Sequence, residues 1–456
     1  VCVFNGGFMS CKRFLTNTLL VGVLGAGSIA YADDAENISQ LRQELEEIKA
    51  IYDAKIRELE TRLEAAEEGQ VARQEPVDLG GRTVRDNTFN PSIGLILNGA
   101  YREFSSGTSE VAGFAVGEDG ERDAGGVGTE HTEFNFSANV DDKFFGSTTF
   151  AIAEHGGTTE VELEEAYLSA LPGAGLPDGM GIKFGRALWA IGYLNEQHAH
   201  TDDFADRPLP YRVFMDHSYN DDGLQFTQLL PTGDLFTEIG GGVFKGQDFP
   251  FGSSAGTGIG AHSYFVRTGG DIGLTQTWRV GAYRLSGETG PSGRISNETN
   301  LTFVGDVDFD VFDLRYTWAP TGNERDQEVT FTAEHFSRDE SGTYADGENS
   351  ISATDYTGSA SGWYSQLTYK FNPRMRVGAR YGELEISTPP SGLSGSLVDS
   401  SGHKPTSISL MADWTNSEFS RIRLQYNKEE LTAGAVDHQW MLQYVMSLGA
   451  HGAHKY

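Results

Sequence analysis

From Ser92 to the end of the chain, short segments alternate apolar with polar side chains, and turn residues end these segments. The clearest segments have the apolar positions Phe134/Phe136/Ala138/Val140, Phe312/Leu314/Tyr316/Trp318, Trp363/Leu367/Tyr369/Phe371, Ile408/Leu410/Ala412/Trp414, Ile422/Leu424/Tyr426 and Trp440/Leu442/Tyr444/Met446/Leu448. A period of two residues is that of a β-strand with one apolar face. In a soluble sandwich that face is the core, but here it is rich in Trp, Tyr and Phe toward the segment ends, as is the lipid-facing side of a transmembrane barrel. The pattern therefore favours a barrel in a membrane.

The composition allows membrane insertion only through strands. Of the 456 residues 38% are hydrophobic, and no stretch after residue 32 approaches the roughly 20 apolar residues of a spanning helix. In lipid, the only other structure that satisfies all backbone polar groups is a closed barrel. A membrane role therefore requires closure of the sheet.

The alternating segments number sixteen. We place the strands near 92–104, 130–140, 144–154, 159–171, 180–190, 222–231, 235–244, 258–267, 274–285, 307–318, 327–337, 359–371, 375–386, 405–415, 419–427 and 438–450. Short turns, such as 141–143 and 268–273, alternate with longer loops, such as 105–129, 190–221 and 337–358. An even strand number with this alternation of connections is the pattern of bacterial outer-membrane barrels. We predict an all-β transmembrane barrel of about 16 antiparallel strands over 92–456, wide enough for an aqueous channel.

The first 91 residues predict three further segments. Residues 1–32 resemble a signal peptide, with Lys12 and Arg13 before an apolar run and an A-x-A site that ends at Ala32. Residues 33–68 carry apolar positions at spacings of 3 and 4, which indicates a short α-helical coiled coil. Residues 69–91 form a linker. We therefore expect export to the outer membrane of a Gram-negative bacterium and, because a coiled-coil seam needs a partner, a homotrimer.

Charge and cysteine content exclude several classes of function. The chain has 34 Lys+Arg against 65 Asp+Glu, so a nucleic-acid partner is not expected. Both cysteines, Cys2 and Cys11, precede the predicted cleavage site, which excludes thiolate metal sites and disulfides from the mature chain. No G-x-S-x-G elbow is present. We expect a protein that is not an enzyme and has no cofactor, whose partners are outer-membrane lipid, small solutes and other copies of the chain.

The loop at 190–221 has the densest cluster of charged and histidine side chains. Its candidate site residues are Glu196, His198, His200, Asp202, Asp203, Asp206, Arg207 and Arg212. In the predicted topology this is the third long outer loop. Basic residues at polar positions of later strands form a candidate lumen wall that faces it, namely Arg279, Arg315, Lys370, Arg376, Arg380, Arg421 and Arg423. A basic wall opposite an acidic loop would place a transverse field across a narrow lumen.

Two segments near this loop resemble a known family. Glu164-Glu165-Ala166-Tyr167-Leu168 and Lys183-Phe184-Gly185-Arg186 are similar to the same region of phosphate-selective-type porins that carry a coiled coil. The stretch from Tyr193 to Tyr211 and the ending Ser447 to Tyr456 are closer to barrels often labelled zinc-regulated or TonB-dependent outer-membrane receptors. The porin resemblance implies that the third outer loop folds into the barrel and forms the pore constriction.

The two resemblances leave two functions open. A porin is a passive channel for small polar or charged solutes. A TonB-dependent or zinc-related receptor imports its ligand, and it needs a plug of roughly a hundred residues inside a larger barrel. Because only residues 33–91 precede the first predicted strand, the passive channel is the preferred interpretation.

His198 and His200, followed by Asp202, Asp203 and Asp206, are also a candidate metal site, and His451 and His454 form a second pair. Imidazole and carboxylate groups bind zinc and similar cations. The alternative is an H-x-H pair without a third ligand of fixed geometry, and it is the preferred interpretation on the sequence alone.

Overall fold

The structure is a computed structural model that describes residues 91–449, apart from 118–119, 123, 130–131, 156–157, 253–257, 291, 297–300, 347–350 and 418. The predicted signal peptide, the coiled coil and nearly all of the linker lie outside the described residues. Within those residues, no helix has the length and apolar character needed to cross a membrane.

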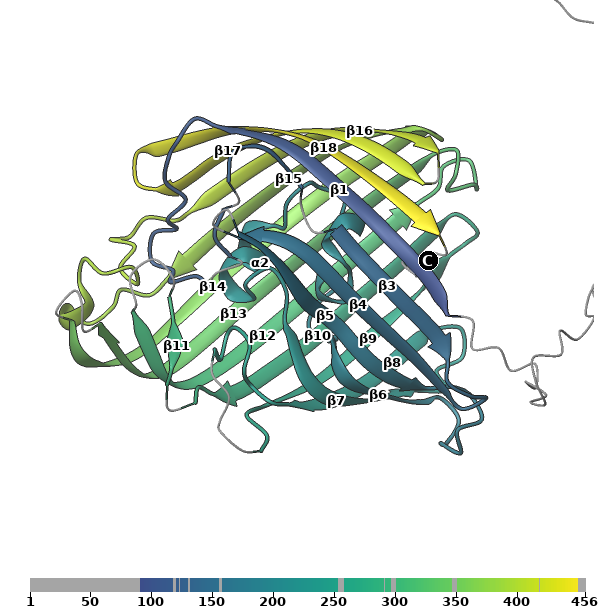
Figure 1. The fold of residues 1–456 in the computed structure, drawn as a ribbon, viewed down its shortest axis with the longest axis horizontal. Coiled ribbons are helices and arrows are strands. Elements are labelled where there is room, and N and C mark those ends of the chain that lie inside the picture. Colours follow the sequence, from purple (N-terminus) through teal and green to yellow (C-terminus); the bar gives the residue numbers. More distant parts are fainter. Residues whose placement is uncertain are drawn as a thin grey trace, which may run out of the picture. The chain divides into compact units, whose positions relative to one another are not determined.

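The strands form one closed antiparallel sheet (Figure 1). They are β1 (Ser92–Phe104), β2 (Gly126–Thr129), β3 (Thr132–Asn139), β4 (Phe144–His155), β5 (Thr158–Ala170), β6 (Met180–Leu188), β7 (Asn220–Leu229), β8 (Phe236–Phe244), β9 (Ala261–Ile272), β10 (Gln276–Glu288), β11 (Arg294–Ile295), β12 (Thr302–Trp318), β13 (Glu328–Asp346), β14 (Ile351–Asn372), β15 (Met375–Ile386), β16 (Thr406–Ser417), β17 (Ser420–Thr432) and β18 (Ala435–Gly449). The first and last strands pair from Gly94↔Gly449 to Phe104↔Gln439, which closes the barrel.

Sixteen of the eighteen labelled strands make the ring. β2 and β3 pair with successive parts of β1, so β2 continues the line of β3. β11 has two residues and pairs with β12. The predicted fold class, a sixteen-stranded antiparallel barrel, is therefore confirmed for the described part of the chain.

Most strand boundaries agree with the prediction, and two connections do not. The predicted turn 268–273 is wrong, because β9 continues to Ile272 and pairs there with Gln276 of β10. The predicted loop 337–358 is also wrong, because β13 and β14 remain paired as far as Asp346↔Ile351. The extension of β13 carries the polar residues Ser337, Asp339 and Ser341 on its outward face, so an apolar alternation could not reveal it.

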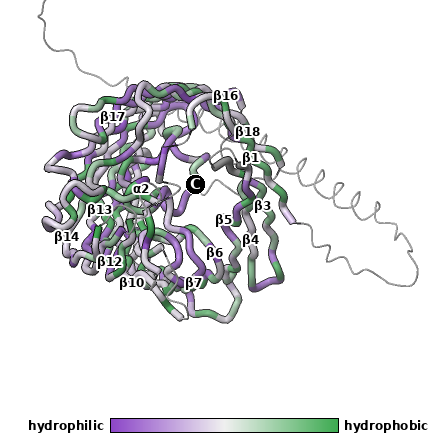
Figure 2. Tube along the Cα trace, turned by 60° about the vertical axis from the view of Figure 1, so that its left-hand side comes forward, coloured by the Kyte–Doolittle hydropathy of each residue, from purple (hydrophilic) through white to green (hydrophobic). Residues whose placement is uncertain are grey.

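Alternation along each strand separates a lipid-facing side from an inner side. On β18, Trp440 and Leu442 are 49% and 48% exposed, whereas Gln439 and Gln443 are 1% and 2% exposed. Figure 2 shows hydrophobic and hydrophilic residues in alternation along the strands. An apolar outer band over a polar interior is the arrangement that a barrel needs in lipid.

The alternation reverses at the loop end of β12. From Phe312 to Trp318 the outward residues are apolar. The three outward positions that precede Phe312 in the strand are Asp306, Asp308 and Asp310. The inward positions there are Val307, Phe309 and Val311, all at most 1% exposed. The expectation of a polar inner face is therefore wrong for this region. The outer face is suited to water there, so this end of β12 extends beyond the apolar band.

Leu367 tests where the apolar band lies. It is exposed on the outward face of β14, between the outward aromatic residues Trp363 and Tyr369. A cation at the centre of a bilayer costs about 2–4 kcal/mol. We expect Leu367→Arg to lower the free energy of unfolding in lipid vesicles by about that amount, as measured by urea titration. Ser359→Arg, on the same outward face but beyond Trp363, is the control and should change it by less than about 0.5 kcal/mol. Equal losses in both variants would contradict this placement.

Candidate functional site

The connection between β6 and β7, residues 189–219, lies inside the barrel, and we call it the inner loop. It contains the short helices η1 (Leu194–Glu196), η2 (Ala199–Thr201) and α2 (Leu209–Phe214). Its Glu196 lies 3.8 Å from Arg279 on β10, and its His200 lies 2.7 Å from Glu133 on β3. Six strands of the ring separate β3 from β10 on one side and eight on the other. The inner loop therefore reaches nearly opposite walls of the ring. Figure 1 shows its helix α2 among the strands of the barrel.

Asp206 is the central anchor at one end of this crossing. Its Oδ1 accepts hydrogen bonds from Arg380 and from Gln425 Nε2 at 2.6 Å, and its Oδ2 accepts one from Asn427 Nδ2 at 2.8 Å. Arg380 Nη1 also donates to the Asp206 carbonyl oxygen at 2.7 Å. Burial raises the pKa of Asp206, but Arg380 and these donors lower it more, so the pKa lies below its ordinary value. Two strands, β15 and β17, thus hold one ionised carboxylate.

Further contacts join the same end of the inner loop to the basic residues. Asp203 forms an ion pair with Arg376, which also lies 2.7 Å from Asp413. Two backbone carbonyls accept hydrogen bonds from β17: that of His200 from Arg421 at 2.7 Å, and that of Asp202 from Arg423 at 2.8 Å. Asp202 itself is buried against Arg207 at 2.8 Å. Burial raises the pKa of Asp202 to about 6, although Arg207 acts in the opposite direction.

Glu196 and Tyr193 attach the start of the inner loop to β9, β10 and β12. Glu196 Oε2 lies 2.5 Å from Arg267 Nη1. The Tyr193 ring has Arg279 at 5.0 Å and Arg315 at 4.8 Å from its centroid. These are distances at which a guanidinium is attracted to an aromatic ring.

Arg207 and Arg212 hold the inner loop in shape. Arg207 donates to the carbonyl oxygens of Leu194 at 2.8 Å and of Gln197 at 2.5 Å, which ties the second half of the loop to the first. Arg212 lies 3.2 Å from Glu429 on β17. Both arginines are buried.

An apolar core inside the barrel supports the inner loop. Phe214 of α2 is fully buried and lies 5.8 Å, between ring centroids, from both Phe114 and Phe309. Its ring stacks on Phe336 of β13 at 6.1 Å. Burying a side chain of this size contributes about 1.5–3 kcal/mol. The loop is therefore held by apolar packing as well as by charge.

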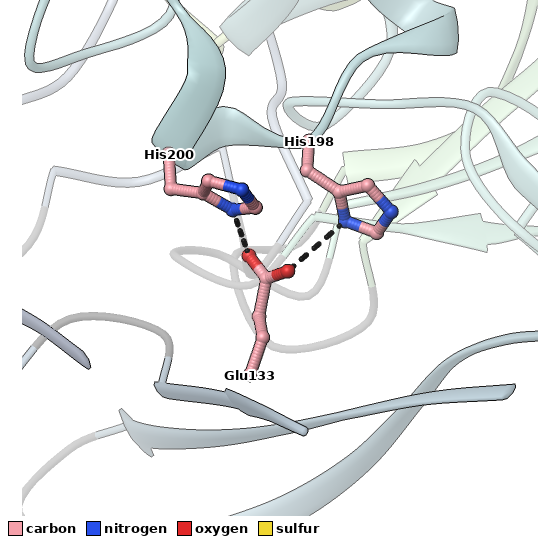
Figure 3. A group of neighbouring side chains, drawn as sticks. All are labelled: Glu133, His198 and His200. Carbon is pink, nitrogen blue, oxygen red and sulfur yellow. Dashed lines mark hydrogen bonds and ion pairs between the residues drawn. The ribbon is translucent and has the colours of Figure 1, made fainter. Parts of the chain in front are cut away.

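The histidines contact a separate acidic group on β3 and β5, whose β3 member, Glu133, is shown in Figure 3. His198 Nδ1 lies 3.3 Å from Glu133 and 3.3 Å from Glu164, and its Nε2 lies 3.0 Å from Glu165. Burial lowers the pKa of His198, but the three carboxylates raise it more, so the pKa lies well above its ordinary value. Glu133, His198 and His200 offer ligand atoms that all lie within 4.8 Å of one another.

Most residues of the predicted basic wall contact the inner loop directly, whereas the prediction had them face it across an open lumen. Arg376 and Arg380 form ion pairs with loop carboxylates, Arg421 and Arg423 bind loop carbonyls, and Arg279 and Arg315 contact Tyr193. The expected transverse field assumed separated charges, whereas these charges are in direct contact. Lys370 differs, because it donates to the Glu324 carbonyl oxygen at 3.0 Å, in the turn between β12 and β13.

Several partners of the inner loop were not expected from the sequence. They are Glu133, Glu164 and Glu165 beside the histidines, Gln425 and Asn427 beside Asp206, Glu429 beside Arg212, and Glu334. Glu334 accepts hydrogen bonds from the Tyr193 amide at 2.6 Å, Tyr211 Oη at 3.1 Å and Tyr364 Oη at 2.5 Å. Alternation does place Glu133 at an inward position of its segment, but nothing in the sequence links it to a loop 67 residues away.

Comparisons with known proteins do not assign the chain to a family. No family model matches the chain. An uncharacterized protein of Aquifex aeolicus is 26% identical over 401 residues, which cover 81% of this chain and 80% of that protein. The outer membrane channel DcaP of Acinetobacter baumannii aligns over 79% of this chain and 97% of its own, with a TM-score of 0.49 and 11% identity. A trimer form of OmpT, an outer membrane protein of Vibrio cholerae, aligns over 79% and 99%, with a TM-score of 0.47 and 9% identity. Function therefore has to be argued from the residues of this chain.

Proposed function

We propose that the chain is an outer-membrane channel for small polar or charged solutes and that the inner loop forms its constriction. The observation that carries the proposal is a charged loop that crosses the lumen of a closed barrel. Sixteen strands enclose more space than their own inward side chains fill. A loop held between opposite walls reduces that space to a defined passage, and its charged side chains then act on whatever passes.

The exterior supports the location. The outward face carries an apolar band with aromatic side chains, among them Trp414, Trp440 and Tyr444. Such a surface is stable in lipid and not in water. Outer membranes of Gram-negative bacteria are where barrels of this kind are found, and the export signal predicted at residues 1–32 is consistent with that destination.

Planar-bilayer recordings and liposome swelling test the channel. Purified protein should give stable steps of ion conductance and should admit small sugars into vesicles without an energy source. A receptor that depends on inner-membrane energy would instead give negligible conductance. Heat-resistant, correctly folded protein that neither conducts nor admits solutes would contradict the proposal.

We further propose a homotrimer assembled through residues 33–68. The apolar positions of that segment, including Leu41, Leu45 and Leu59, bury little area unless several chains share them. Deleting 33–68 should convert the trimer to a monomer in mild detergent, as measured by light scattering. A variant that replaces Glu46 and Glu47, which lie between the apolar positions, with Gln should remain trimeric. A deletion variant of unchanged mass would show that the barrels associate in another way.

A further inference from the structure

We propose that Glu133, His198 and His200 bind a divalent transition metal of the zinc type and that this metal ties the inner loop to β3. The inference goes beyond channel function, because a channel needs no metal and a metal site needs no conduction. Its basis is the meeting of two imidazoles from the loop with a carboxylate from the wall (Figure 3).

The geometry of the cluster suits one ion. Glu133 presents its two oxygens to different histidines, with Oε1 2.7 Å from His200 Nδ1 and Oε2 3.3 Å from His198 Nδ1. The two rings lie 5.7 Å apart between centroids. Zinc bonds to nitrogen and oxygen ligands at about 2.0–2.2 Å. Small rotations of the rings and of the carboxylate bring all three ligand atoms to an ion between them.

Glu164 and Glu165 add negative charge beside His198. Pairing of β4 with β5 shifts by one residue at this point, with Thr149 opposite Glu165 and Phe150 opposite Leu163. Such a bulge re-aims a side chain, and here consecutive carboxylates contact the same imidazole, that of His198. Together with Glu133 they place three carboxylates around two imidazoles. This negative charge favours a bound cation.

The ligands are also held from behind. Arg421 donates to the His200 carbonyl oxygen at 2.7 Å, and Thr201 Oγ1 donates to the His198 carbonyl oxygen at 2.7 Å. On the wall, Asn220 Nδ2 donates to the Glu164 carbonyl oxygen, and the Leu188 amide donates to Glu165 at 3.3 Å. Contacts of this kind fix the orientation of the ligands. Their loss typically lowers metal affinity about 10–100-fold.

The donor set selects the class of metal. Two imidazoles with carboxylates suit Zn²⁺ and its neighbours, whereas Mg²⁺ and Ca²⁺ prefer oxygen ligands alone. No cysteine follows Cys11, so no thiolate competes within residues 33–456. A bound ion would link the inner loop to β3, which lies three strands along the ring from β17, the strand whose Gln425 and Asn427 hold Asp206.

Calorimetric titration of the metal-free protein with ZnCl₂ tests the inference. The protein should be purified without a histidine tag and stripped with EDTA. We expect one zinc per chain and little heat from MgCl₂ at the same concentrations. The X-ray absorption spectrum of the bound zinc should be fitted by nitrogen and oxygen ligands, two of them imidazoles.

Matched variants then assign the site. Glu133→Gln and His200→Gln should each weaken zinc binding at least tenfold, by about the factor seen when metal ligands are disturbed. His262→Gln, on the exposed outer face of β9, and the double change His451→Gln with His454→Gln should leave it unchanged. A difference in gel mobility between unboiled and boiled samples of each variant checks that it remains a closed barrel.

Two results would overturn the inference. One is a folded wild-type protein that binds no zinc, and the other is zinc binding that survives in Glu133→Gln and His200→Gln but is lost with His451 and His454. Neither result bears on conduction, so failure of this inference is distinguishable from failure of the channel proposal.

Discussion

Replacing Asp206 with alanine is expected to release the inner loop from the wall and to raise the single-channel conductance several-fold. The change removes the partner of Arg380 together with the acceptor of Gln425 and Asn427. Breaking a fully buried ion pair from one side costs about 3–5 kcal/mol, and this pair, in which Arg380 is buried and Asp206 partly exposed, should lose less than that. The ion pair of Asp203 with Arg376 and the carbonyl contacts of Arg380, Arg421 and Arg423 remain in this variant. Because the carboxylate contacts to β15 and β17 are lost, the residues around Asp206 should shift within the lumen and widen the passage.

Planar-bilayer recordings at fixed salt measure this change, and larger current fluctuations should accompany it. Asp142→Ala, in the exposed turn between β3 and β4, is the matched control and should leave the conductance unaltered. Because the pKa of Asp206 lies below its ordinary value, its stabilising contribution is complete above the unfolded pKa, near 3.8, and is lost only as pH falls through the lower folded value. The effect of Asp206→Ala on the conductance should therefore be the same from about pH 5 to about pH 8, because this whole range lies at least about one unit above 3.8. Unchanged conductance in a folded Asp206→Ala protein would mean that the acidic end does not hold the loop in place.

Phe214→Ala should have the second large effect, and it acts through packing. Phe214 is in contact with Phe114, Phe309 and Phe336 inside the barrel. Truncating a buried Phe to Ala costs about 3–5 kcal/mol. Because the closed sheet does not depend on this residue, the cost should fall on α2 and on the loop around it rather than on the barrel.

Limited trypsin digestion reports this local opening. In the native protein Arg212, which precedes Val213, is buried, so cleavage at this trypsin site of the inner loop should be slow. In Phe214→Ala the bond after Arg212 should be cut rapidly while the barrel still resists heat and detergent. Phe312→Ala removes an equal volume from the lipid-facing side of β12 and should behave as the native protein does. Equal protection of Arg212 in both variants would show that the apolar core does not support the loop.

The strands could be read from the sequence because lipid demands strict alternation. The bounds of β1 and β15 equal the predicted ranges, since each strand ends at an apolar residue that is followed by serine, Ser105 and Ser387. The same reasoning failed beyond the band. At Asp308 and Phe309 the surroundings change from lipid to water outside and from solvent to packed core inside, and alternation alone does not say which face is which.

The inner loop was predictable in position and charge but not in its partners. Its place as the third long connection and its cluster from Glu196 to Arg212 are features of the sequence. The pairing of Asp206 with Asn427 joins residues 221 positions apart, and no local pattern encodes such a contact. For the same reason His198 and His200 were expected to have no third ligand of fixed geometry, whereas the fold brings Glu133 to both.

Modification of a single cysteine at Ala199 most directly tests the central claim that the inner loop lines the conducting passage. Ala199 is the exposed residue between the two histidines, and the chain after Cys11 has no cysteine of its own. In Ala199→Cys, a charged methanethiosulfonate reagent added during a bilayer recording should lower the single-channel conductance in permanent steps. Leu274→Cys, fully exposed in the short turn between β9 and β10, should react without any change in current. Complete modification of Ala199→Cys, verified by mass spectrometry, with an unchanged conductance would contradict the account.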